Sequence, residues 1–185
     1  MTRALIPLAA GCEELEAVTL IDLFRRAGIE VVVAGLVPGP VTASRGTVLV
    51  PDTTLEAVAD QAFDLIVLPG GLPGADHLAA DPLLRRLLQH HAGGRGLTGA
   101  ICAAPKVLAA AGLLAGKSAT CYPGAVDVAA HPDIRWLSEP VVVDGTLVTS
   151  RGPGTAMDFA LALIERLLGR QRRDEVEAKL LRPGA

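Results

Sequence analysis

The stretch that decides the fold is ALIPLAAGCEELEAVTLIDLFRRAGIEVVVA, residues 4–34. Short apolar runs at 4–9 and 29–34 are typical of buried strands. Between them, residues 13–27 follow a helical period that ends at Gly28. One face of this helix carries the core-facing stripe Ala17, Leu20, Ile21 and Phe24. A strand, a helix and a strand in this order predict a βαβ unit in a parallel sheet.

The same alternation continues along the chain. Further strands are expected at 64–68, 97–101 and 118–121, and hairpins at 41–50 and 140–150, the second with a type I′ turn at Asp144-Gly145. Helices are expected at 54–60, 82–91, 104–114 and 155–168, followed by a charged helix and a Pro-Gly tail within 171–185. The chain has 185 residues, half of them hydrophobic. It therefore predicts a single α/β domain over 1–185 with a mostly parallel sheet.

Composition and charge exclude several classes of partner. The net charge of -3 and the 3% aromatic content give no basic, base-stacking surface, so no dedicated nucleic-acid ligand is expected. No apolar run reaches the roughly 18 residues that a bilayer-spanning helix needs. The apolar N-terminal run is interrupted by Pro7 and leads into Gly11-Cys12-Glu13, which favours a strand over a signal peptide. We expect a cytoplasmic protein that does not bind membranes.

The three cysteines are Cys12, Cys102 and Cys121. They form no CxxC pair and have no histidine at zinc-ligand spacing, so neither a disulfide framework nor a metal site is expected. Cys12 and Cys121 are assigned mainly to packing, with secondary oxidation as the alternative.

Cys102 lies in GAICAAP, residues 99–105, between a predicted strand and an Ala-rich helix. Small residues two positions before and after it match the spacing of a nucleophile elbow. A helix that begins there favours the thiolate and lowers the thiol pKa, and its N–H groups can stabilise an oxyanion. An inert cysteine at the end of a buried strand explains the same spacing, so both interpretations stay open.

Two other segments are expected near Cys102. Glu13 and Glu16 extend the buried stripe of the first helix, whereas carboxylates at a helix start, including Glu14, are often only solvated. Gly70-Gly71 follows the strand at 64–68 and lacks the spacing of a phosphate-binding loop. Because the carboxyl ends of parallel strands meet at one edge, a carboxyl group, a thiol and a glycine turn are expected there together.

Four segments together resemble the DJ-1/PfpI superfamily, also called ThiJ. They are EELE at 13–16, LPGG at 68–71, AICA at 100–103 and SRGPGT at 150–155. The resemblance runs from about Arg3 to Leu168. It implies a flavodoxin-like three-layer sandwich of the class I glutamine amidotransferase type, and a homodimer.

The resemblance also implies roles for individual residues. Cys102 would be the nucleophile and Glu16 its hydrogen-bonded carboxyl group. The N–H groups of Gly71 and Ala103 would bind the oxyanion, with Gly70 in the substrate region. Glu13 matches a second carboxylate with a structural or dimer-linked role.

Arg45 and Arg151 match arginines that line the same region, although ordinary ion pairing is an alternative for both. Tyr122 lies where some members have a histidine, and either hydrogen-bonds substrate or only packs over the pocket. None of His77, His90, His91 and His131 has a matching context, which argues against a peptidase triad.

The resemblance implies a cofactor-independent glyoxalase or deglycase acting on reactive dicarbonyls such as methylglyoxal, or on their adducts. The rival interpretation is a redox sensor or redox-responsive chaperone that oxidises Cys102. An amidase or peptidase is a third, and it requires a histidine beside Cys102.

Overall fold

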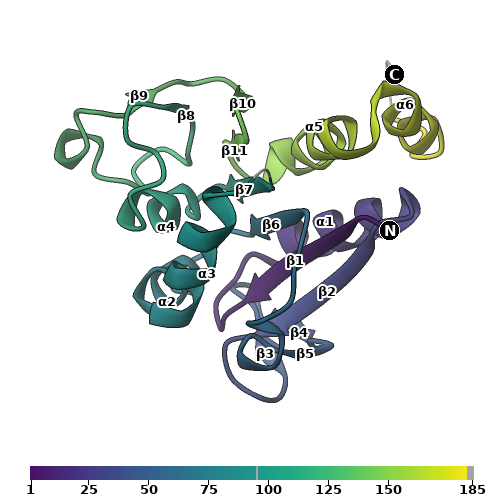
Figure 1. Cartoon of the computed structure of the whole chain (residues 1–185), viewed down its shortest axis with the longest axis horizontal. Coiled ribbons are helices and arrows are strands. Elements are labelled where there is room, and N and C mark those ends of the chain that lie inside the picture. Colours follow the sequence, from purple (N-terminus) through teal and green to yellow (C-terminus); the bar gives the residue numbers. More distant parts are fainter. Residues whose placement is uncertain (95, 183–185) are drawn as a thin grey trace.

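The computed structural model describes residues 1–94 and 96–182, built around one seven-stranded sheet (Figure 1). In spatial order the strands are β10 (Val141–Asp144), β11 (Leu147–Ser150), β7 (Leu97–Ile101), β6 (Leu65–Leu68), β1 (Arg3–Leu8), β2 (Glu30–Gly35) and β5 (Thr53–Thr54). Every neighbouring pair is parallel except β10 and β11. The predicted α/β fold with a mostly parallel sheet is confirmed.

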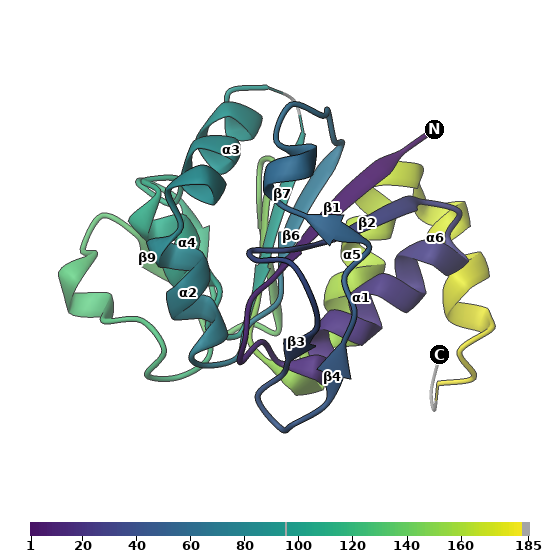
Figure 2. The same ribbon diagram turned by 90° about the horizontal axis from the view of Figure 1, so that it is seen from below.

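Helices cover both faces of this sheet, as Figure 2 shows with the sheet seen nearly edge-on. One face carries α1 (Glu14–Arg26), α5 (Ala156–Leu168) and α6 (Arg170–Ala178). The other carries α2 (Gly74–Ala80), α3 (Pro82–Ala92) and α4 (Pro105–Ala110). The buried side chains accordingly form two apolar clusters, one on each side of the strands. This is the three-layer sandwich that the family resemblance implies.

Alternation along the strands explains the two clusters. Ala4 and Ile6 of β1 pack in the cluster on the α1 side, whereas Leu5 packs in the cluster on the α3 side. The stripe predicted for α1 is buried at Ala17, Leu20 and Phe24, and only partly at Ile21. Burial of these stripes on a two-sided sheet holds the carboxyl ends of β1, β6 and β7 in one place.

Several peripheral elements differ from the sequence prediction. The expected strand at 118–121 is only β8 (Ser118–Ala119), and it pairs with β9 (Arg135–Trp136) outside the main sheet. The expected helix at 54–60 is a 3₁₀ turn at Glu56–Val58, and two further 3₁₀ turns span Val128–Ala130 and Pro153–Thr155. The hairpin expected at 41–50 is confirmed as β3 (Val41–Thr42) and β4 (Val48–Leu49).

Two local predictions are wrong for reasons of backbone geometry. Asp144 pairs with Leu147, so the turn is Gly145-Thr146, and only Gly145 has a positive φ, which excludes type I′. The helix predicted at 104–114 ends at Ala110, because Gly112 adopts a positive φ of 77° just beyond it. Helix α2 (Gly74–Ala80) has no counterpart among the helices that the sequence predicts.

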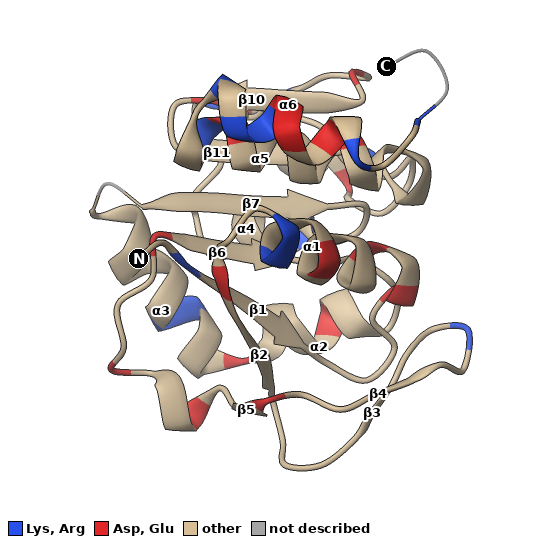
Figure 3. Ribbon diagram, turned by 90° about the vertical axis from the view of Figure 1, so that its right-hand side faces the viewer, with Lys and Arg blue, Asp and Glu red and all other residues tan. Residues whose placement is uncertain are grey.

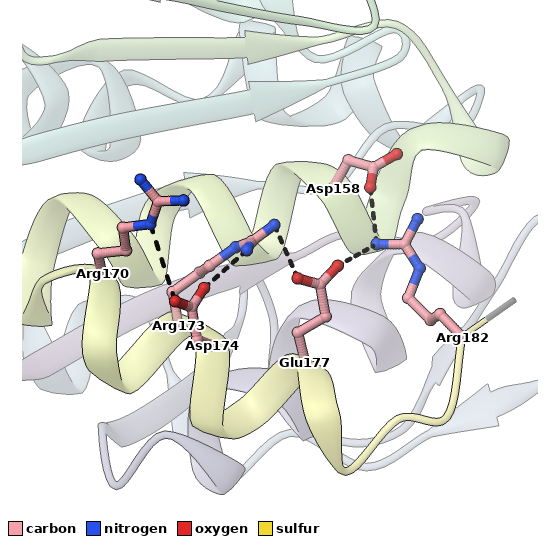
Figure 4. A network of polar contacts seen from close by, with 6 residues as sticks. All are labelled: Asp158, Arg170, Arg173, Asp174, Glu177 and Arg182. Atoms are coloured by element: carbon pink, nitrogen blue, oxygen red, sulfur yellow. Dashed lines mark hydrogen bonds and ion pairs between the residues drawn. The ribbon is translucent and has the colours of Figure 1, made fainter. Parts of the chain in front are cut away.

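The charged helix α6 is attached to the body by one buried residue and a chain of ion pairs. Val176 is 2% exposed and packs in the α1-side cluster. Arg173 contacts Glu177 at 2.8 Å, and Arg182 contacts Glu177 at 3.2 Å and Asp158 of α5 at 2.7 Å (Figure 4). Lys, Arg, Asp and Glu are interspersed along α6 (Figure 3). The Pro-Gly tail predicted after this helix lies largely outside the described residues.

Over the described ranges, no helix combines the length and the hydropathy that crossing a bilayer requires.

Candidate active site

Cys102 occupies the sharp turn between β7 and α4. Its φ of 64° is in the left-handed region, which a side chain other than glycine adopts at a cost of about 1–2 kcal/mol. The turn is fixed from both sides, because its N–H donates to Ser150 O (2.9 Å) and its C=O accepts from Tyr122 N–H (2.8 Å). Cys102 is only 8% exposed. The sharp turn predicted at Cys102 is therefore present, with a strained backbone that hydrogen bonds hold from both sides.

Glu16, in the first turn of α1, is the carboxyl group that acts on the Cys102 thiol. It is fully buried, and its Oε2 accepts a 2.8 Å hydrogen bond from Gly70 N–H. The thiol of Cys102 acts on this carboxyl group and lowers its pKa, and Oε1 has no hydrogen-bond partner within the described ranges. Burial raises the pKa of Glu16 to about 7, and the bonds from Gly70 and Cys102 only partly offset this rise. A carboxyl group that exchanges protons near neutral pH lies against the thiol.

The two glycines after β6 are required by close approach. A Cβ on Gly70 would lie 2.6 Å from Cys102 Cβ and 2.8 Å from Glu16 Oε2. Gly71 has a φ of 88°, and a Cβ there would collide with the backbone of Cys12 and Glu13. Because the N–H of Gly70 is already bonded to Glu16, Gly70 holds the carboxyl group and is not free to bind substrate through that N–H.

The electrostatics of Cys102 differ from the sequence prediction. Its pKa is raised to about 12, first by burial and then by the charge and hydrogen bond of Glu16. The N–H groups of Gly71 and Ala103 act in the opposite direction, because they hydrogen-bond to the sulfur. Since α4 is only six residues long, the helix effect invoked from the sequence is small. Burial and Glu16 therefore oppose the lowering of the Cys102 pKa that the sequence predicts.

The other two glutamates hold a neighbouring loop. Glu13 accepts from Ser44 Oγ at 2.8 Å, in keeping with a structural role. Glu14 accepts from the backbone N–H groups of Arg45 and Thr47 at 3.1–3.2 Å. Burial raises the pKa of Glu14, but hydrogen bonds from the backbone N–H groups of Glu14 itself, Arg45 and Thr47 outweigh this effect and lower the pKa to about 2. Glu14 thus joins α1 to the β3–β4 hairpin through hydrogen bonds, a structural role that its sequence spacing did not indicate.

The remaining predicted site residues lie around this centre rather than in it. Arg45 is in the exposed β3–β4 turn, and only its backbone is bonded to Glu14. Arg151 follows β11, and its charge acts on the thiol of Cys121. Tyr122 is 50% exposed and its ring lies against Gly152. Packing accounts for the Tyr122 ring, while its backbone N–H supports Cys102.

Histidines are absent from this centre. Within the described ranges, the groups that act on the Cys102 thiol are Glu16, Gly71 and Ala103. His77 bonds to Ala10 O, and His91 bonds to Leu97 O. A Cys/His triad cannot be assembled from these positions, which argues against the peptidase interpretation.

A cavity of about 670 Å³ lies elsewhere, beside the amino ends of the strands, lined by residues that include Phe63, Arg86 and His90. It is remote from Cys102, which is at the carboxyl end of β7. Within 1–94 and 96–182, no three His, Cys, Asp or Glu side chains are grouped to hold a metal ion.

Comparison with known proteins agrees with this geometry. The chain is 46% identical over 179 residues to Protein dj-1beta of Drosophila melanogaster, covering 96% of both chains. It is 38% identical over 164 residues to a Caenorhabditis elegans protein named glutathione-independent glyoxalase DJR-1.2, covering 89% of this chain and 87% of that one. The crystal structure of Drosophila DJ-1beta superposes with a TM-score of 0.94 at 45% identity, covering 98% of each chain. The sequence profile of the DJ-1/PfpI family matches residues 2–166, and the chain belongs to this family.

Proposed function

We propose that this protein is a cofactor-independent enzyme that uses Cys102 to convert reactive dicarbonyls, such as methylglyoxal, to hydroxy acids, and that it also acts on their early adducts with thiols and amines. The observation that carries the proposal is the contact between the Cys102 thiol and a buried carboxyl group, Glu16, whose pKa is about 7. A general base is most effective when its pKa is close to the working pH.

The first step forms a hemithioacetal. The Glu16 carboxylate accepts the thiol proton as the sulfur of Cys102 attacks the aldehyde carbon. The carbonyl oxygen gains negative charge, and the N–H groups of Gly71 and Ala103, already directed at the sulfur, stabilise it. A high-pKa thiol is a strong nucleophile once its proton is removed, so the raised pKa of Cys102 is compatible with this chemistry.

The second step moves a proton between adjacent carbons. A base removes the proton from the carbon that bears the sulfur, giving an enediol, and the same group returns a proton to the neighbouring carbon. Glu16 is suited to both transfers because neither protonation state is strongly favoured near neutral pH. The product is the thioester of the hydroxy acid. Water then cleaves the thioester, releases lactate from methylglyoxal and restores the thiol.

The name of the Caenorhabditis elegans relative, a glutathione-independent glyoxalase, supports this reaction class. The test is lactate formation from methylglyoxal without glutathione, comparing wild type, Cys102→Ala and Glu16→Gln. Cys12→Ala is the matched control, since Cys12 is a fully buried cysteine in the core cluster. We expect both site variants to lose at least about 100-fold in kcat/KM, in line with the loss of a nucleophile or general base. Unchanged turnover by Cys102→Ala would refute the proposal.

A second candidate function is redox sensing or a redox-responsive chaperone activity. It is favoured by the solved structure titled Toxoplasma gondii DJ-1, oxidized, which superposes with a TM-score of 0.91 at 38% identity. A protonated Glu16 can donate a hydrogen bond to an oxygen on the Cys102 sulfur, and so stabilise an oxidised form. Mass spectrometry after peroxide treatment tests this candidate. Glu16→Gln should shift the distribution of oxidised species, and an unaltered distribution would count against it.

We also propose that the protein forms a homodimer. Leu15 and Val18 of α1 are 51% and 46% exposed, and Val48 of the adjoining hairpin is 58% exposed. These apolar side chains flank the Glu14 contacts that join the two elements. Light scattering should give twice the chain mass, and Val18→Lys should shift the equilibrium toward the monomer. A monomeric wild type at high concentration would overturn this proposal.

A further inference from the structure

Cys121 is a second thiol at the edge of the candidate active site. It follows β8 and is half-buried, in contrast with Cys12, which is fully buried. The next residue, Tyr122, donates its N–H to the carbonyl of Cys102 at 2.8 Å. This hydrogen bond brings the backbone of Cys121 alongside the strained turn at Cys102.

The hydrogen bond fixes the separation of the two cysteines. With planar peptides and standard bond lengths, it keeps the Cα atoms of Cys102 and Cys121 within roughly 4–6 Å of each other. Disulfide-bonded cysteines usually have Cα atoms about 4.4–6.8 Å apart. The Cα separation is therefore compatible with a disulfide, and a bond between the sulfurs requires both side chains to rotate toward each other.

Both cysteines border the same third segment, which follows β11. The N–H of Cys102 donates to Ser150 O, and the charge of Arg151 acts on the Cys121 thiol. A nearby guanidinium favours the thiolate of Cys121, in opposition to its partial burial. Burial is the larger of the two effects and raises the pKa of the Cys121 thiol, so the fold supplies the proximity of Cys121 to Cys102 and a cation that partly offsets this rise.

We propose that Cys121 is the resolving cysteine for Cys102, and that a hydroperoxide drives formation of an intramolecular Cys102–Cys121 disulfide. The Cys102 sulfur attacks the peroxide, the O–O bond breaks, and a sulfenic acid and an alcohol or water result. The Cys121 thiolate then attacks the sulfenic sulfur, an S–S bond forms, the S–O bond breaks and water leaves. In total, two thiols lose two electrons and one hydroperoxide is reduced.

This inference rests on the reactivity of Cys102 in the proposed function, and it adds a consequence for regulation. A disulfide can be reduced by thiols, whereas a sulfinic acid on Cys102 resists them. Capture by Cys121 would keep the cysteine recoverable after exposure to peroxide. It would also block the nucleophile reversibly while the bond persists.

The test uses the full chain, treated with hydrogen peroxide, alkylated and mapped by mass spectrometry. Wild type should lose two hydrogens in mass, stay monomeric in denaturing gels without reductant, and yield a peptide pair joined through residues 102 and 121. Cys121→Ser should instead accumulate sulfenic and sulfinic acid on Cys102, about 10-fold more than wild type. Cys12→Ala is the matched control and should still form the bond.

The reverse reaction gives a second readout. After peroxide, dithiothreitol should restore methylglyoxal turnover fully in wild type but only in part in Cys121→Ser, because thiols reduce a sulfenic acid and not a sulfinic acid. Equal sulfinic acid in both proteins, or a bond that joins Cys12 or two chains, would overturn the inference. Turnover by the reduced protein separates the two proposals. Methylglyoxal turnover without disulfide formation would refute only the disulfide, and disulfide formation without turnover would refute only the glyoxalase function.

Discussion

Glu16→Gln should make the protein more stable at alkaline pH while it removes activity. The carboxyl group has a pKa of 4.5 in the unfolded chain and about 7 in the folded one, because burial penalises its charge. Below pH 4.5 the carboxyl group is protonated in both states, and its titration does not change the free energy of unfolding. As pH rises from 4.5 to about 7, the unfolded chain binds fewer protons than the folded protein, so stability falls.

The size of this loss follows from the shift. At about 1.4 kcal/mol per pKa unit, a rise from 4.5 to about 7 corresponds to about 3 kcal/mol. Glu16→Gln keeps the side-chain shape and an oxygen that accepts the N–H of Gly70. The variant carries no titrating group, so its stability relative to wild type should rise by about 3 kcal/mol between pH 4.5 and 8.

The assay is urea denaturation of wild type and Glu16→Gln at half-unit steps from pH 4.5 to 8, with reductant present. Subtracting the two curves removes the contribution of every other titrating group. Glu56→Gln is the matched control, because Glu56 is a solvent-exposed carboxylate on a 3₁₀ turn. A difference between Glu16→Gln and wild type that stays flat with pH would refute the argued burial of this charge.

Three further predictions follow from contacts around the site. Gly70→Ala forces a Cβ to 2.6 Å from Cys102 Cβ and should cost about 1–3 kcal/mol in thermal unfolding, whereas Gly154→Ala, with open space around it, should not. Glu14→Ala removes the acceptor of Thr47 N–H, so hydrogen–deuterium exchange of that amide should be faster. An unchanged exchange rate would contradict the role of Glu14 in joining α1 to the β3–β4 hairpin. Arg182→Ala breaks partly exposed ion pairs and should cost less than about 1 kcal/mol, with a smaller effect in high salt, and a salt-independent loss would contradict it.

The sequence predicts best where a pattern is repeated over a whole element. The strands and helix within 4–34 follow from periodicity, and the stripe that ends at Phe24 extends back to Glu16 and predicts its burial. The meeting of Glu16, Gly70 and Cys102 follows because parallel strands end at one edge. These features depend on local spacing and on a general rule of topology.

The remaining features depend on partners that are distant in sequence. The bond from Cys102 N–H to Ser150 O needs β11 to lie beside β7, which no local pattern specifies. Glu14 has the spacing of a solvated helix-start carboxylate, and only the fold brings the amides of the β3–β4 turn to it. Helix α2 cannot be predicted from local sequence, because it begins at Gly74, and glycine is more typical of loops than of helices. The fold requires glycine at this position because the backbone of Cys12 lies against it.

The pKa values of the pair show how these distant contacts decide the chemistry. From the sequence alone, a helix start beside Cys102 favours a resting thiolate; in the fold, burial and the Glu16 carboxyl group outweigh it. Glu16, with a pKa of about 7, is the group placed to accept the thiol proton when substrate arrives. The same burial that destabilises the fold above pH 4.5 thus supplies a general base whose pKa is close to neutral pH.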